Sequence, residues 1–134
     1  MRGTLVDSSV LLDVFTEDDE WFDWSASMLE RAAHETELVI NPIIYAEVSP
    51  QFDSIEELDE ALPTAFCRRA SLPWEAGFLA GRAFVEYRRT GGVRRSPLPD
   101  FYIGAHAAIE GLTLLTRDAR RYHKYFRSLR IIAP

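Results

Sequence analysis

Residues 3–9, Gly-Thr-Leu-Val-Asp-Ser-Ser, join a short apolar run to a polar triplet near the start of the chain. The run has the length of a buried strand, and Asp or Ser directly before a helix is a preferred cap. Apolar residues then recur at helical spacing, at Val10, Leu11, Val14 and Phe15. A strand that passes straight into a helix is the unit from which parallel sheets are built, so this stretch predicts an α/β fold.

The same alternation continues to the end of the chain. Further strands are expected at residues 38–40, weakly at 65–67, and at 112–116 and 129–132. Helices are expected up to about His34, over 41–48, 54–62, 74–89 and 100–110, and in a short turn from Asp118. This order predicts a single domain over residues 1–134, a three-layer α/β/α sandwich with a central parallel sheet of four or five strands.

The composition limits which classes of protein remain. The chain has 134 residues, of which 47% are hydrophobic and 27% charged, as in a globular domain with one core. No apolar run approaches the roughly 20 residues of a membrane helix. An acid at position 7 interrupts any secretory signal, so we expect a cytoplasmic protein without membrane contact. Cys67 is the only cysteine, which excludes an internal disulfide and a thiolate metal cluster.

Charge is divided unevenly along the chain. The net charge is −6, but residues 1–67 hold two basic and 16 acidic side chains, whereas residues 68–134 hold 13 basic and five acidic ones. The second half therefore offers either a basic surface to a polyanion or a solvated face that pairs with the acidic half. The sequence leaves both interpretations open.

Three aspartates occupy positions where a parallel sheet holds its functional groups. Asp7 and Asp118 follow apolar strands directly or within two residues, so both would lie at the same carboxyl edge of the sheet. Asp100 begins a helix and shares a face with Gly104, and a small residue there lets a ligand come close. Each aspartate could instead serve as an ordinary helix cap.

Glu47 lies on a helical face with two aliphatic residues. Ile43 and Ile44 precede it by four and three positions. A carboxylate there is partly buried unless the face borders a cleft, and burial without a partner is costly. No basic residue lies between Arg31 and Arg68 to pair with it locally. The alternative is a carboxylate at the helix edge, on the boundary of the core.

The four acids form a functional site if the topology brings them to one edge. Clustered carboxylates repel one another, and a divalent cation removes that conflict. Mg²⁺ prefers oxygen ligands and usually takes one or two carboxylates directly, so the other acids can act through water. Such a cation polarises a phosphoryl oxygen and activates a water for attack. The sequence has no glycine-rich phosphate loop, no Gly-x-Ser-x-Gly motif and no His-Glu-x-x-His motif for competing chemistries.

Four segments resemble the PIN-domain family, in particular the VapC-like toxin nucleases of toxin–antitoxin pairs. They are residues 5–12, 41–48, 99–107 and 112–122, in the family's order. The resemblance implies Mg²⁺- or Mn²⁺-dependent hydrolysis of RNA phosphodiester bonds. It implies that the catalytic and metal-binding residues are Asp7, Glu47, Asp100 and Asp118. It also implies Ser9 and Thr116 as polar helpers near the metal, although a β-branched threonine equally suits the end of a strand.

The resemblance further implies a homodimer and a cognate antitoxin that lays a helix or tail across the toxin. Candidate docking residues are apolar side chains of the first two helices, which core packing would also explain: Leu11, Phe15, Trp21 and Trp24. Candidate contacts to RNA phosphates are the arginines near the last two acids: Arg94, Arg95, Arg117, Arg120 and Arg121.

Two other functions stay open at this point. A PIN-like domain that binds RNA or a protein without cutting would share the fold and would tolerate acid-to-amide changes. A phospho-accepting receiver domain also carries acids at its sheet edge, but it needs an acid pair beside the first strand and a late lysine. This chain offers Asp7 alone beside that strand, and Lys124 is poorly placed for the second role.

Overall fold

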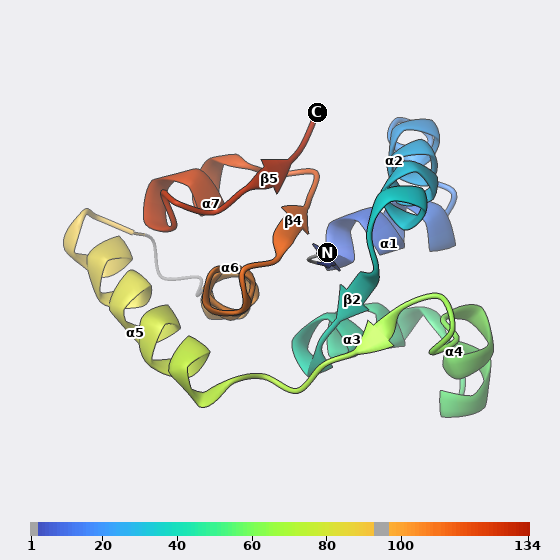
Figure 1. Cartoon of the computed structure of the whole chain (residues 1–134), viewed down its shortest axis with the longest axis horizontal. Coiled ribbons are helices and arrows are strands. Elements are labelled where there is room, and N and C mark those ends of the chain that lie inside the picture. The colour runs from blue at the N-terminus through green and yellow to red at the C-terminus, as the bar shows by residue number, and fades with distance from the viewer. Residues whose placement is uncertain (1–2, 93–96) are drawn as a thin grey trace.

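The computed structural model describes residues 3–92 and 97–134 and contains a five-stranded parallel sheet (Figure 1). The strands are β1 Thr4–Val6, β2 Leu38–Ile40, β3 Arg68–Arg69, β4 Thr113–Leu115 and β5 Ile131–Ile132. Their order across the sheet is β3-β2-β1-β4-β5. The first strand therefore lies at the centre, where Leu5 is in register with Val39 on one side and Leu114 on the other.

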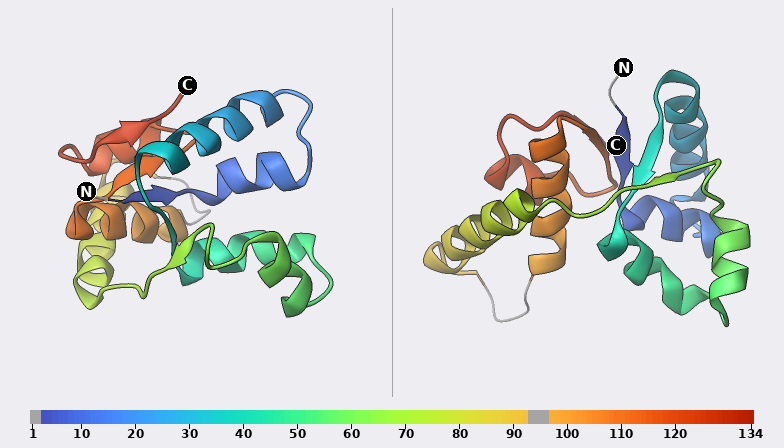
Figure 2. Two further views of the ribbon diagram at one scale, coloured as in Figure 1. Left: turned by 45° about the vertical axis from the view of Figure 1, so that its right-hand side comes forward. Right: turned by 60° about the horizontal axis from the view of Figure 1, so that its bottom comes forward.

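Helices flank the sheet on both sides. They are α1 Ser8–Phe15, α2 Phe22–Glu35, α3 Pro42–Val48, the 3-10 helix η1 Ser49–Gln51, α4 Ile55–Ala61, α5 Trp74–Arg89, α6 Leu98–Glu110 and α7 Arg120–Tyr125. α1 to α4 lie on one side of the strands and α5 to α7 on the other (Figure 2). The predicted α/β/α sandwich with a central parallel sheet is thus confirmed. Within the described ranges, none of the helices has the length and hydropathy needed to cross a membrane.

The central strands form the core because both of their faces are covered. Leu5, Val6, Val39 and Ile40 are all 0% exposed. Their short runs are apolar except for Thr4, which is also buried, and this is the pattern of a buried parallel strand. The edge strand β3 consists of two exposed arginines instead, and charged side chains on an edge protect it from pairing with other chains.

Three helix ends have residues whose geometry suits a cap. Asn41 Oδ1 accepts a hydrogen bond from the backbone N–H of Ile44 at 2.9 Å, which caps α3. Ser54 Oγ accepts from the N–H of Glu57 at 3.1 Å and caps α4. Gly111 ends α6 with a φ of 67°, a left-handed conformation that glycine adopts without steric cost.

Four predicted boundaries are wrong by more than one residue. The helical turn expected from Asp118 begins at Arg120, and the strand expected at 129–132 begins at Ile131. The strand expected at 65–67 lies at β3, because the N–H groups of Phe66 and Cys67 both bond the carbonyl of Pro63 in a turn and cannot join the sheet. The helix expected from Asp100 begins two residues earlier, and Pro99 lies in its first turn, where the N–H that proline lacks has no helical partner anyway. Asp100 is therefore the third residue of α6 rather than its cap.

The strand order also determines where a site can form. After β3 the chain crosses back over the sheet to β4 on the far side of β1, so the connections leave β1 and β4 in opposite directions. In open α/β sheets, ligands bind at the carboxyl ends of strands at such a switch point.

Candidate active site

Asp7 stands at the carboxyl end of β1 and is held by two hydroxyl groups. Thr116, which follows β4, donates from Oγ1 to Asp7 Oδ2 at 2.7 Å, and Ser9 donates from Oγ to the same oxygen at 3.1 Å. Asp7 has the backbone position of the α1 cap, but its side chain makes no capping hydrogen bond. A hydroxyl that follows β4 and a hydroxyl in the first turn of α1, rather than a capping bond, therefore orient this carboxylate.

The surroundings of Asp7 disfavour its charged form. Asp7 is 5% exposed. Burial raises its pKa from 3.8 to about 6, and the charges of Asp100 and Glu47 add to the rise, whereas the hydrogen bonds from Thr116 and Ser9 oppose it. A buried acid beside two further acids is the arrangement in which a bound cation most favours ionisation.

Glu47 reaches the same region from α3. It is half-buried, and Ser8 donates from Oγ to its Oε1 at 2.7 Å. Burial raises the pKa of Glu47, as does the charge of Asp100, whereas the hydrogen bond from Ser8 lowers it. Ser8 was not among the predicted site residues. The adjacent serines of the Asp-Ser-Ser triplet were the available signal, because one serine serves each acid.

Asp100, on the first turn of α6, is ion-paired with Arg121 of α7. Burial raises the pKa of Asp100 and the charge of Asp118 adds to that, while Arg121 acts in the opposite direction. Asp118 itself is exposed, and its N–H donates to Thr116 Oγ1 at 3.1 Å. α7 begins at Arg120 with Ala119 as its cap residue, so Asp118 is not a helix cap.

The four acids thus form one electrostatic group. The charge of Asp100 raises the pKa of Asp7 and the pKa of Glu47, and the charge of Asp118 raises the pKa of Asp100. The PIN-domain sequence model matches residues 4–127, which include all four acids and the five strands except the last. The chain belongs to the PIN-domain family.

Solved structures share the fold of this PIN domain over nearly the whole chain. A chain of the VapBC2 complex from Rickettsia felis, bound to a promoter DNA fragment, matches with a TM-score of 0.73 and 17% identity over 98% of each chain. A chain of DNA-bound VapBC from Salmonella typhimurium matches at 0.70 and 17%, over 99% of this chain and 98% of that one. VapBC-1 of nontypeable Haemophilus influenzae gives 0.71 and 15%, over 97% and 96%. No curated protein sequence matches significantly.

Arg117 of this PIN domain is held by the protein's own side chains. Its Nε donates to Asp13 Oδ2 at 2.8 Å, and its guanidinium lies 5.4 Å from the ring centre of Trp21. Asp13 is 2% exposed and also accepts from Ser25 Oγ at 2.7 Å. This cluster ties the loop between Thr116 and α7 to α1 and α2. Asp13 was not among the predicted residues, because an acid within an amphipathic helix has no distinctive pattern.

The other arginines that were predicted to contact RNA phosphates fall into three groups. Arg120 is exposed on α7, and Arg94 and Arg95 lie outside the described residues. Arg121 is engaged with Asp100 rather than free on the surface.

The proposed docking side chains are mostly packed. Leu11 is 1% exposed and belongs to the core. Phe15 is half-buried with its ring 5.2 Å from that of Phe52, and the half-buried rings of Trp21 and Trp24 lie 6.2 Å apart. Leu11 offers a partner almost no surface, whereas the other three each present part of a ring.

The donor groups of the site suit a hard cation. They are carboxylates with supporting hydroxyls, and His106 is instead paired with Asn41 in the interior at 2.9 Å. Among residues 3–92 and 97–134, no three acidic, histidine or cysteine side chains stand close enough together to form a ready metal centre. Mg²⁺ needs only one or two direct carboxylates and keeps several waters, so the donor set of the PIN domain still fits Mg²⁺ or Mn²⁺.

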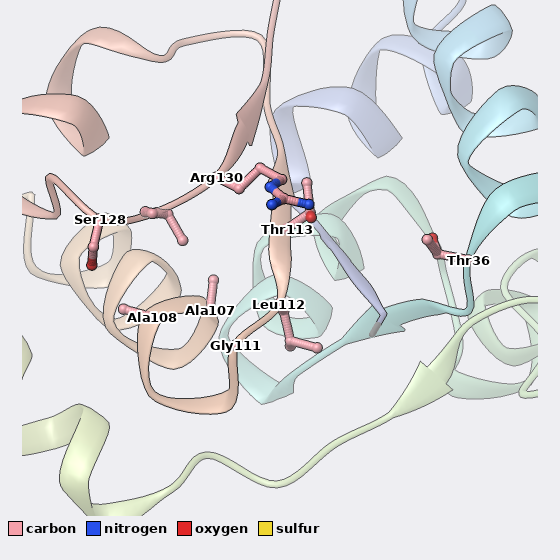
Figure 3. A pocket seen from close by; sticks show the side chains of 9 residues that line it. Thr36, Ala107, Ala108, Gly111, Leu112, Thr113, Ser128 and Arg130 are labelled. Atoms are coloured by element: carbon pink, nitrogen blue, oxygen red, sulfur yellow. The ribbon is translucent and has the colours of Figure 1, made fainter. Parts of the chain in front are cut away.

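A separate cavity lies at the opposite edge of the sheet. It has a volume of about 510 Å³, and Thr36, Leu112 and Arg130 on its wall each immediately or closely precede a strand (Figure 3). Its lining residues include none of the four acids. This cavity is therefore separate from the candidate site at the four acids.

The raised pKa of Asp7 predicts that the metal-free protein loses stability as pH rises. The folded state retains the Asp7 proton up to about pH 6, whereas the unfolded chain releases it near 3.8. The contribution of Asp7 to the free energy of unfolding should therefore be greatest below pH 3.8. It should fall by up to about 3 kcal/mol between pH 4 and 6. Urea unfolding in EDTA measures this slope.

Asp7→Asn is the matched variant for that measurement. Glu47 and Asp100 also have raised pKa values and contribute with the same sign, so the slope should shrink rather than vanish. A slope as steep in Asp7→Asn as in the wild type would show that Asp7 is not the titrating group.

Proposed function

We propose that this PIN domain is a Mg²⁺- or Mn²⁺-dependent endoribonuclease and the toxin of a toxin–antitoxin pair. The observation that carries the proposal is the group of four acids at the switch point of the sheet, centred on a buried aspartate. The toxin role draws on structurally similar proteins described as VapBC complexes, and RNA as the substrate rests on the family resemblance.

The hydrogen bonds leave one carboxylate oxygen of Asp7 and one of Glu47 available to a ligand. Both hydroxyls at Asp7 donate to Oδ2, and Ser8 donates to Oε1 of Glu47, whereas no described residue donates to Asp7 Oδ1 or Glu47 Oε2. Those two oxygens are the ones that can hold a cation or its waters. A bound divalent cation supplies positive charge to a phosphoryl oxygen and makes a water more acidic.

The remaining residues orient this pair. Ser8, Ser9 and Thr116 fix the rotamers of the two carboxylates before any ligand binds, which limits reorganisation during the reaction. Asp100 carries a negative charge that Arg121 balances. Asp118 is exposed beside Thr116, where its carboxylate can hold a water.

The test of the function is cleavage of a mixed panel of structured RNAs by purified, antitoxin-free protein. Cutting in Mg²⁺ or Mn²⁺ that stops with EDTA supports the nuclease. Binding of RNA without cutting in any metal supports a silent PIN-like binding module instead. Cutting that persists in EDTA contradicts the metal dependence.

An antitoxin has a suitable surface between α2 and the segment after α4. A groove of about 390 Å³ there is lined by apolar side chains, including Val14, Leu29, Ala33 and Phe66. Phe66 is 42% exposed. The groove lies within the acidic first half of the chain, so an amphipathic, basic antitoxin segment complements it in both hydropathy and charge.

The helix α5 supports the proposed homodimer. Trp74, Phe78 and Val85 are 94%, 69% and 52% exposed and, with Gly81, follow a spacing that places them on one helical face. In an antiparallel pairing of two copies about a two-fold axis, Trp74 meets Val85 and Phe78 meets Gly81, beside which a side chain has open space. Such pairing also brings Glu75 near Arg82 of the second copy, an attractive combination of charges.

Phe78→Glu is expected to convert the dimer to a monomer, because it places two charges against the apolar centre of the interface. Size-exclusion chromatography with light scattering measures the mass. Ile55→Glu on α4 is the matched control, since Ile55 is 61% exposed on another surface. A wild type at monomer mass at every concentration, or equal effects of the two variants, would exclude this interface.

A further inference from the structure

The hydroxyl of Tyr122 on α7 differs from the other buried polar side chains that the structure describes. It is the one buried side-chain nitrogen or oxygen in residues 3–92 and 97–134 that has no hydrogen-bond partner. Tyr122 is 2% exposed. Leaving a buried donor unpaired is costly, and such groups in native proteins call for an explanation, often a catalytic or ligand-binding one.

The ring of Tyr122 packs directly against the helix that carries Asp100. Gly104 lies one turn after Asp100 on the same face of α6. A Cβ at Gly104 would lie 2.9 Å from Tyr122 Cδ1 and 2.6 Å from Phe126 Cε2, so only glycine leaves room for both rings. The residue before Tyr122 is Arg121, which holds Asp100. Tyr122 therefore packs against the turn of α6 that follows Asp100, next to the arginine that pairs with Asp100.

The hydroxyl also lies within the electrostatic reach of the acids. Burial raises the pKa of Tyr122 well above 10, and the charges of Asp7, Asp100 and Glu47, in that order, raise it further. The hydroxyl therefore keeps its proton at neutral pH and can act only as a neutral donor. The charges of those three carboxylates act on the hydroxyl, yet among the described residues it has no hydrogen-bond partner.

We propose that Tyr122 is a positioning residue whose hydroxyl donates a hydrogen bond to a carboxylate of the acid cluster, foremost Asp7, when that cluster holds a divalent cation. The inference rests on the proposed function, because it presumes a cation at these acids. Asp7 Oδ1 is the acceptor without a donor among the described residues, and Tyr122 has the donor without an acceptor. When the acids gather around a cation, the hydroxyl of Tyr122 donates to Asp7 Oδ1.

The variant Tyr122→Phe separates this role from ordinary packing, because it removes the hydroxyl and keeps the ring. In the metal-free protein the hydroxyl is unpaired, so the variant should have an unchanged or higher melting temperature. With MnCl₂ the variant loses a hydrogen bond to a charged group. Its Mn²⁺ Kd, measured by calorimetry with the metal alone, should rise about tenfold, and the melting-temperature gain from Mn²⁺ should shrink.

Tyr125→Phe is the matched control, since Tyr125 is a half-buried residue of the same helix that packs against Phe101 at 5.1 Å. It should bind Mn²⁺ as the wild type does. A second readout needs no variant at position 122: adding Mn²⁺ to Tyr125→Phe should still red-shift the tyrosine absorbance. This readout decides the question if Tyr122→Phe does not fold.

Each outcome decides between the inference and the function on which it rests. Wild-type protein that neither binds Mn²⁺ nor cuts RNA overturns both. Wild-type protein that binds Mn²⁺ and cuts, together with a Tyr122→Phe variant of equal Mn²⁺ affinity, overturns the role of Tyr122 alone. A loss of metal-free stability in Tyr122→Phe equal to its loss with Mn²⁺ shows that the hydroxyl is structural in both states, and also overturns it.

Discussion

Asp100→Asn is expected to lower metal-dependent RNA cleavage by about 10²- to 10³-fold while the protein stays folded. The amide keeps the shape of the side chain but removes the charge that acts on Asp7 and Glu47. It also leaves Arg121 without its carboxylate partner, so a positive charge stays beside the position of the cation. Both effects weaken the binding of a cation at the site, and activity should fall with each.

The measurement is the initial rate of cleavage in Mg²⁺ and Mn²⁺ for the wild type, Asp100→Asn and Asp7→Asn. Asp53→Asn is the matched control, because Asp53 is exposed at the start of α4 and lies outside the acid group. Equal cutting by the wild type and Asp100→Asn would point to a contaminating nuclease or to a site elsewhere in the chain, and would end the four-acid proposal.

Asp13→Ala is expected to reduce the free energy of unfolding by about 2–3 kcal/mol. Removing one partner of a buried ion pair commonly costs about 3–5 kcal/mol. The loss is smaller here because the side chain of Arg117 is 35% exposed and can turn towards water, whereas Ser25 at 0% exposure cannot. The loop that carries Thr116 and Asp118 also loses its attachment to α1, so cleavage should fall together with stability.

Urea unfolding of Asp13→Ala, Arg117→Ala and the double variant measures the coupling directly. The double variant should lose less stability than the sum of the single variants, because each single change already removes the shared contact. Asp53→Ala serves as the exposed control and should change stability by less than about 0.5 kcal/mol. Strictly additive losses would show that Asp13 and Arg117 act independently.

Much of the fold could be predicted because its signals are local. The apolar run that ends at Asp7 is a strand, and Asn41, Ser54 and Gly111 stand at helix ends as their capping chemistry requires. The strand β3 could not be located in this way. Its two residues are exposed arginines, which have no apolar pattern, and only pairing with β2 makes them a strand.

The residues of the candidate site also include some that could be predicted from the sequence and some that could not. The four acids could be proposed from the sequence because each borders a strand or begins near a helix, and the resemblance connected them. Ser8, Asp13 and Tyr122 could not be proposed. Ser8 bonds a residue 39 positions away, and Asp13 bonds one 104 positions away. An isolated hydroxyl or carboxylate shows nothing of a partner that is distant in sequence.

The sequence by itself therefore determined the order of strands and helices along the chain and the helix caps, because backbone preferences and hydropathy act over a few residues, and it named the four acids as candidates. Only the tertiary structure decided which acid is buried, which arginine neutralises which carboxylate, and which hydroxyl is left unpaired. These properties depend on distances between side chains brought together by the strand order. In a region of low dielectric, a shift of a few ångströms determines whether a charge is stabilised or opposed.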